Sequence, residues 1–210
     1  DCRTAVEGLL VAGEDAGGTH GANRLGGNGV AESTVFGARA GDTAADLATR
    51  RLREPDPAAV QASFARALVP LGRRGEQPAD LLAELKDVMW QGCGLVRSRA
   101  GLEEAAASVD DLLERAGEAA APGGREWNLG WQQALDVVNQ LQVARTMVAA
   151  ALVREESRGA HFREDFPERR DEWLRYVVTR RTEDGSIETS TRPVEFTRCP
   201  PPSAVARSAA

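Results

Sequence analysis

The chain has 210 residues, of which 42% are hydrophobic and 28% are charged, and its net charge is −6 at neutral pH. These proportions are typical of a globular protein with one large or two small domains. The acidic balance argues against general affinity for nucleic acids, and no apolar run approaches the roughly 20 residues of a membrane-spanning helix.

The first 52 residues predict a strand, a loop and a helix. Residues 8–12 (GLLVA) form a short apolar run, which predicts a buried strand of a parallel sheet. A glycine-rich loop follows over residues 13–29, and residues 30–50 have helical character despite internal glycines. Ligands bind at the carboxyl ends of such strands, so this unit predicts a Rossmann-like piece of a nucleotide-binding domain.

The sequence predicts a mainly helical domain over residues 53–174. Asp56 is expected to cap a short helix from Pro57 to about Leu68. Apolar residues then recur at helical spacing in three longer segments, around residues 81–89, 102–113 and 129–158. Each segment carries one apolar stripe, and stripes that must face one another predict a three-helix bundle.

A β-hairpin is expected over residues 175–198. Two β-rich runs flank Glu183-Asp184-Gly185, and an Asp-Gly step between such runs favours a tight hairpin turn. The proline-rich tail over 199–210 is expected to be disordered. The predicted fold class is therefore α+β and mostly α.

Two basic side chains in the glycine-rich loop suit an anionic ligand. Arg24 lies among small residues, which leave space for a bidentate grip on a carboxylate. His20, four residues earlier, can donate to the same anion. The alternative for Arg24 is an ordinary exposed loop arginine.

The start of the helix and the end of the strand supply two further candidates. A helix beginning at Gly29 and Val30 points free N–H groups at the loop and favours an anion, although a plain tight turn has the same glycines. Glu14 follows the strand and can accept hydrogen bonds from ligand hydroxyls. A helix cap or a surface charge is the alternative for Glu14. The three cysteines are far apart, which indicates no metal site and suits a reducing, cytoplasmic compartment.

Two motifs resemble a known family. The string GEDAGGTHGANRLGGNGVAESTVFGARAGD at residues 13–42 resembles the flavoprotein subunits of succinate dehydrogenase and fumarate reductase, whose superfamily includes L-aspartate oxidase. The segment ESRGAHFREDFP at residues 156–167, with DEWL at 171–174 and GLVR at 94–97, resembles the carboxy-terminal helical domain of the same family.

The resemblance implies an FAD-dependent oxidoreductase that interconverts succinate and fumarate, or a related dicarboxylate, by hydride transfer to or from flavin N5. It implies that Arg24 binds a carboxylate of the substrate, with His20 nearby, and that Glu14 contacts the ribityl part of FAD. The contacts to FAD are implied for four residues, Glu14, Asn28, Gly29 and Val30. His161, among charged neighbours, is interpreted as part of an ion-paired segment that fixes the end of the long helix. A contact to the flavin domain or substrate is the alternative for His161.

Several parts of the family's site are absent from the sequence. The GxGxxG loop for the ADP part of FAD and the capping domain with the proton-donor arginine have no counterpart here, so no catalytic residue is assigned. We therefore expect the carboxy-terminal part of a larger flavoprotein, inactive by itself. The expected partners are the upstream remainder of the flavoprotein, a dicarboxylate and an iron–sulfur subunit. Partner subunits would hold the protein peripherally at the cytoplasmic face of the inner membrane.

Two other interpretations stay open. The same bundle suits a catalytically inactive helical interaction module, and the same motifs suit the carboxy-terminal part of an L-aspartate oxidase-type enzyme. Glu14, His20 and Arg24 favour an enzyme, because a docking module has no use for them.

Overall fold

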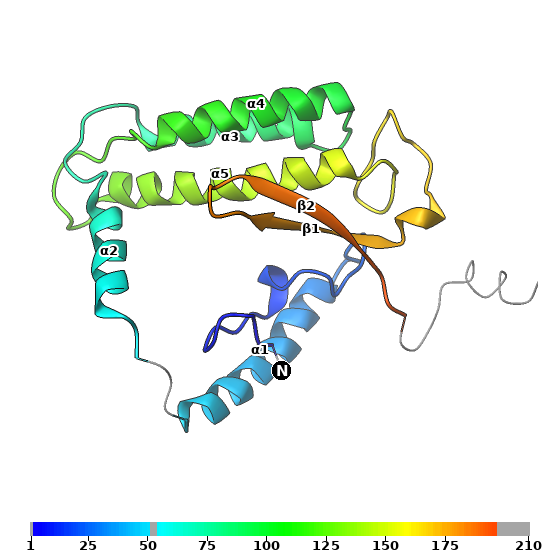
Figure 1. The fold of residues 1–210 in the computed structure, drawn as a ribbon, viewed down its shortest axis with the longest axis horizontal. Helices are drawn as coiled ribbons and strands as arrows, with labels where there is room; N and C mark the ends of the chain where they lie inside the picture. Colours follow the sequence, from blue (N-terminus) through cyan, green and yellow to red (C-terminus); the bar gives the residue numbers. More distant parts are fainter. Residues whose placement is uncertain (1, 51–53, 197–210) are drawn as a thin grey trace, which may run out of the picture. The chain divides into compact units, whose positions relative to one another are not determined.

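The computed structural model describes residues 2–50 and 54–196. Contacts divide the chain into two compact units, Asp1–Phe64 and Ala65–Ala210, and the division falls within the helix α2 (Pro57–Leu68). The elements are labelled in Figure 1. The domain boundary expected near residue 52 and the tail expected over 199–210 lie outside the described residues.

The first unit is built on the helix α1 (Asn28–Ala48), which begins two residues before the predicted start. Gly27 precedes it with a φ of 83°, a left-handed conformation that glycine adopts without steric cost. A short 3-10 helix, η1 (Gly13–Asp15), packs against α1. The loop between η1 and α1 therefore begins and ends next to this helix.

The strand expected over residues 8–12 is absent from the described part of this unit. Leu10 instead makes an isolated antiparallel bridge with Arg3, and the backbone N–H of Val11 donates to the carbonyl of Cys2 at 2.8 Å. The side chain of Leu9 is more than half exposed. A strand needs at least one neighbouring strand to pair its backbone N–H and C=O groups, and the described residues of this unit supply none. The apolar run therefore turns back on the residues just before it.

The second unit contains the predicted three-helix bundle. It consists of α3 (Pro78–Cys93), α4 (Arg99–Ala116) and α5 (Leu129–Val153), which lie alongside one another in Figure 1. The apolar stripes meet in a buried core, whose largest members are Leu81, Leu85, Val109, Leu112, Val137 and Leu141. A second cluster continues the core toward the end of α5 and includes Cys93, Leu102 and Val148.

Side-chain caps explain where α2 and α5 begin. The carboxylate of Asp56 accepts from the backbone N–H of Ala58 at 3.0 Å, as predicted, with Pro57 as the first helical residue. The amide oxygen of Asn128 accepts from the N–H of Trp131 at 2.9 Å. Each cap satisfies a donor that has no intrahelical partner.

The helix α5 ends at Val153, five residues before the predicted end. Arg154 is already extended, with φ −80° and ψ 100°. The guanidinium of Arg163 donates to the carbonyl of Ala151 at 2.8 Å, which takes a free carbonyl of the last turn. The helix therefore ends where its apolar residues give way to charged and polar ones at 154–158, and Arg163 takes up a carbonyl of its last turn.

The predicted hairpin is present as β1 (Arg175–Arg181) and β2 (Ile187–Pro193). The strands are antiparallel, with Val178 opposite Ser190, and Gly185 in the turn has a φ of 85°. Figure 1 shows the hairpin lying along α5, against which both strands pack. The fold is therefore mostly α with one small sheet. Across residues 2–50 and 54–196, no helix combines the length and apolar character needed to cross a membrane.

Candidate functional site

The first unit contains an open groove of about 600 Å³ between the glycine-rich loop and the start of α1. Five of the six predicted site residues line this groove: Glu14, His20, Arg24, Gly29 and Val30. The sixth, Asn28, is the first residue of α1 and is not part of the lining. The loop thus brings together side chains that are up to 16 residues apart in sequence.

Arg24 presents a guanidinium without a carboxylate partner among the residues that the structure describes. Its one hydrogen bond there is a long contact of 3.5 Å from Nη1 to the carbonyl of Leu25. The side chain packs directly over Gly29, where an added Cβ would lie 3.3 Å from both Cδ and Nη1 of Arg24. Gly29 therefore gives Arg24 the space to lie across the start of the helix.

His20 is held by a carboxylate that the sequence did not reveal. Its Nε2 is hydrogen-bonded to Oε2 of Glu32, a side chain on α1 that is only 5% exposed. Both residues line the groove. With Nε2–H directed at Glu32, the other ring nitrogen, Nδ1, is left for a ligand. The available signal was the position of Glu32 in the first turn of the predicted helix, because its side chain points back toward the start of the helix.

The start of α1 offers backbone donors to the same groove. Within residues 2–50 and 54–196, no side chain caps this end, and the N–H of Asn28 donates to the carbonyl of Leu25 at 3.2 Å. The N–H groups of Gly29 and Val30 belong to the first turn, which has no intrahelical acceptors. Together with the positive end of the helix dipole, they favour an anionic or carbonyl oxygen in the groove.

Glu14 lines the groove from η1. Its neighbour Gly13 is buried, has a φ of 77° and fits closely against Ser33, whose Oγ would lie 2.8 Å from an added Cβ. This contact fixes η1 against α1. The side chain of Glu14 is exposed and has no ion pair within the described ranges, so its carboxylate can accept hydrogen bonds.

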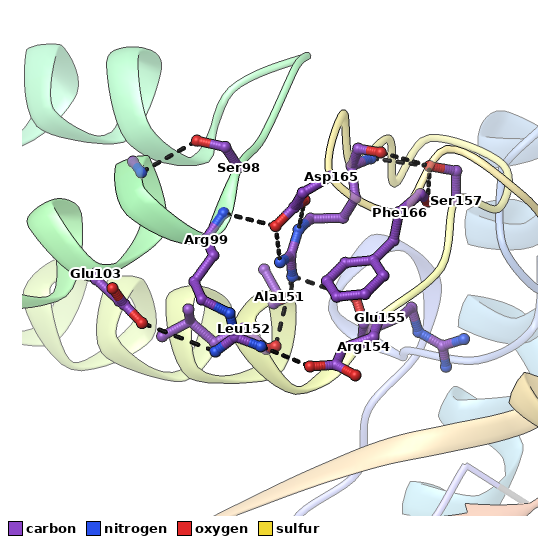
Figure 2. A network of polar contacts seen from close by, with 12 residues as sticks. Ser98, Arg99, Glu103, Ala151, Leu152, Arg154, Glu155, Ser157, Asp165 and Phe166 are labelled. Carbon is purple, nitrogen blue, oxygen red and sulfur yellow. Dashed lines mark hydrogen bonds and ion pairs between the residues drawn. The ribbon is translucent and has the colours of Figure 1, made fainter.

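The second matched segment forms a polar cluster at the end of α5, in the second unit. Arg163 is fully buried, and its guanidinium grips Asp165 through Nε–Oδ1 at 2.8 Å and Nη2–Oδ2 at 2.7 Å. Figure 2 shows how Asp165 also accepts from the backbone N–H of Arg99, while the side chain of Arg99 reaches Glu155. This cluster ties the start of α4 to the loop after α5.

Glu156 and His161 lie in the same cluster and have shifted pKa values. Burial raises the pKa of Glu156, but hydrogen bonds from Arg158, Arg154 and the backbone of Arg170 outweigh it and lower the pKa overall. Burial lowers the pKa of His161, and nearby arginines lower it further. These contacts agree with the interpretation of His161 as part of a segment that fixes the end of the long helix.

Asp165 has a pKa of about 2, chiefly because the Arg163 guanidinium stabilises its charged form. The cluster is therefore arranged as fixed charges around a buried guanidinium. At its centre, Arg163 and Asp165 satisfy each other through two hydrogen bonds.

Comparisons with known proteins match both units. A family model described as the fumarate reductase flavoprotein C-terminus matches residues 82–206. A fumarate reductase (CoM/CoB) chain from Methanothermobacter marburgensis is 40% identical over 179 residues, which cover 85% of this chain and 33% of that protein. The L-aspartate oxidase of Streptomyces coelicolor is 35% identical over 204 residues, which cover 90% and 32%.

A solved structure also matches most of this chain. The Mycobacterium smegmatis Sdh1 complex in the apo form superposes with a TM-score of 0.80 at 38% identity, covering 91% of this chain and 33% of that chain. The chain spans about a third of the length of each of these relatives.

Proposed function

The chain belongs to the fumarate reductase and succinate dehydrogenase flavoprotein family, as the C-terminal part of such a flavoprotein, and we propose that its groove forms one side of a flavin and dicarboxylate site. The reaction proposed for the full-length protein is the interconversion of succinate and fumarate, or of a related dicarboxylate, by hydride transfer. FAD would supply the hydride donor and acceptor at N5.

The residues of the groove fit a flavin at the start of α1. The N–H groups of Gly29 and Val30 have no acceptor within the helix, and the uncapped end favours electron-rich oxygen atoms of a ligand. Glu14, which lines the same groove, carries an exposed carboxylate for the hydroxyl groups of a ribityl chain. Asn28, just outside the lining, completes the proposed cofactor contacts.

Arg24 is the residue proposed to bind a carboxylate of the substrate. An arginine that faces a groove without a carboxylate partner in the described part of the chain is available for a bidentate grip on a ligand carboxylate. His20 faces the same groove, so it can bind the same dicarboxylate. Both groups hold and orient substrate. The groove offers no group that we assign as proton donor.

The test is the substitution Arg24→Gln in the full-length flavoprotein. Hydrogen bonds to charged groups contribute about 1.5–3 kcal/mol, so kcat/KM for succinate should fall roughly tenfold or more. The content of FAD, measured from flavin absorbance after denaturation, should not change. The matched control is Arg39→Gln, because Arg39 lies on the same helix outside the groove.

Two results would contradict this assignment. Unchanged succinate-dependent dye reduction in Arg24→Gln would remove the carboxylate role of Arg24. Tight FAD binding and turnover by the purified 210-residue chain would contradict our expectation that the rest of the flavin site lies outside this chain.

An amino-dicarboxylate is the second candidate substrate, because the Streptomyces coelicolor relative is an L-aspartate oxidase. Side-by-side assays with succinate, fumarate and aspartate decide between the two. We further propose that the full-length protein passes its electrons to an iron–sulfur partner and is held peripherally at the membrane through its partners. Support comes from the matched Sdh1 structure, which is described as a complex. Co-purification of an iron–sulfur protein tests this proposal.

A further inference from the structure

The geometry points to a second anion site, in the helical unit, that takes a short-chain carboxylate between Arg97 and His161. A cavity of about 230 Å³ opens between the end of α3, the last turns of α5 and the strand β1. Arg97, Arg154 and His161 form its polar wall, with the apolar side chains of Met147 and Val177 beside them. All of these residues belong to the second unit, whereas the proposed flavin groove lies in the first.

Arg97 is held rigidly by groups that carry no negative charge. Its backbone N–H donates to the carbonyl of Phe162 at 3.1 Å, and its carbonyl accepts from the N–H of Glu164 at 2.9 Å. In the side chain, Nε donates to the carbonyl of Cys93 at 3.2 Å and Nη1 donates to Nδ1 of His161 at 2.7 Å. These contacts hold the guanidinium in one position, and none of them supplies a negative charge.

The neighbouring arginines have carboxylate partners, and Arg97 does not have one within the described ranges. Arg154 is paired with Glu156, and Arg163 is paired with Asp165. A half-buried positive charge without a partner is costly, because burial removes water that would otherwise stabilise it. The wall of this cavity thus carries an uncompensated positive charge, although the chain as a whole has a net charge of −6.

His161 stands beside this charge as a neutral ring. Because Nδ1 accepts from Arg97, the ring proton lies on Nε2, which donates to the carbonyl of Arg154 at 3.2 Å. Burial and then the positive charges of Arg97, Arg154 and Arg163 lower the pKa of His161, and the Cys93 thiol adds no charge because burial raises its pKa. An anion bound at Arg97 would weaken that repulsion, so the ring reports on occupancy.

The rest of the lining indicates what kind of anion fits. Met147, Ala150 and Ala151 from α5 and Val177 from β1 form an apolar wall next to the guanidinium. Such a wall suits an aliphatic chain, and the small cavity limits that chain to a few carbon atoms. A carboxylate with a short apolar tail matches both features better than a fully hydrated anion such as phosphate.

Nuclear magnetic resonance of the 210-residue chain tests the site, since the chain contains only two histidines. Butyrate is titrated at constant ionic strength, with chloride as the salt control, and His161→Gln assigns the two sets of ring signals. We expect a saturable shift of the His161 signals, larger than any shift of the His20 signals, and a higher pKa of His161 at saturation.

Two variants separate the site from general charge effects. Arg97→Gln should weaken butyrate binding at least tenfold. The matched control Arg99→Gln removes an exposed arginine two residues away, which pairs with Glu155, and should leave the affinity unchanged. Circular dichroism of both variants establishes that they are folded, and Arg97→Lys, which keeps the charge without the planar fork, should bind with intermediate affinity.

The proposal is overturned if butyrate shifts the His161 signals no more than chloride does, if Arg97→Gln binds as tightly as the parent chain, or if phosphate binds more tightly than butyrate. None of these measurements needs FAD or Arg24. A negative result here therefore leaves the proposed flavin and dicarboxylate site standing, and a failure of the Arg24→Gln test leaves this site standing.

Discussion

Replacing Arg163 with methionine should remove the main tie at the end of α5. The side chain is fully buried, makes two charge-assisted hydrogen bonds to Asp165 and donates to the carbonyl of Ala151 at 2.8 Å. Its guanidinium also lies 5.0 Å from the ring centroid of Phe166. Methionine retains much of the apolar volume, so the substitution isolates the polar contacts.

The contacts of Arg163 determine how much the free energy of unfolding should fall. Removing one partner of a buried ion pair typically costs about 3–5 kcal/mol. Asp165 is 29% exposed and keeps the hydrogen bond from the N–H of Arg99, so water and backbone offset part of the cost. The carbonyl of Ala151 loses its strongest donor at a buried helix end, which adds to the cost. We therefore expect the free energy of unfolding to fall by about 3 kcal/mol, which is a large fraction of the 5–15 kcal/mol of an ordinary domain.

Urea unfolding of the 210-residue chain, followed by far-ultraviolet circular dichroism, measures this loss from the transition midpoint at constant slope. The matched control is Arg180→Met, because Arg180 is 78% exposed and lies 3.7 Å from Glu188. An exposed pair of this kind contributes about 0–1 kcal/mol. If the free energies of unfolding of the two variants differ by less than about 1 kcal/mol, the buried guanidinium does not hold the end of α5.

Three further predictions concern the helical unit. Burial lowers the pKa of His161, so below about pH 6.5 the unfolded chain binds a proton that the folded chain does not. The free energy of unfolding should therefore fall as the pH drops below about 6.5. Urea unfolding at a series of pH values should show a weaker dependence of this free energy on pH for His161→Gln. Gly92→Ala should lower the melting temperature by several degrees, because its Cβ would lie 2.6 Å from Cβ of Ala105; an unchanged melting temperature would contradict this packing. Asn128→Ala should cost about 1 kcal/mol in urea unfolding through the lost cap to Trp131, whereas no loss would show that the cap is dispensable.

The candidate site was partly visible in the sequence. The loop residues Glu14, His20 and Arg24 could be selected because charged side chains among glycines suit a ligand, and the structure places all three at one groove. Glu32 was missed, because a glutamate in a predicted helix has the pattern of an ordinary solvated residue. Its role depends on the contact with His20 across the loop.

Regular spacing along the chain determined most of the helical unit. Three segments with apolar residues at helical spacing can bury their stripes only against one another, so the bundle follows from the sequence, as does the hairpin from its Asp-Gly turn. Contacts in three dimensions decided the rest. Leu10 bridges to Arg3, the Arg163 guanidinium holds the last turn of α5, and Arg97 has no carboxylate partner in the described part of the chain. These outcomes depend on which groups lie beside one another in space, and periodicity along a single segment carries no information about that.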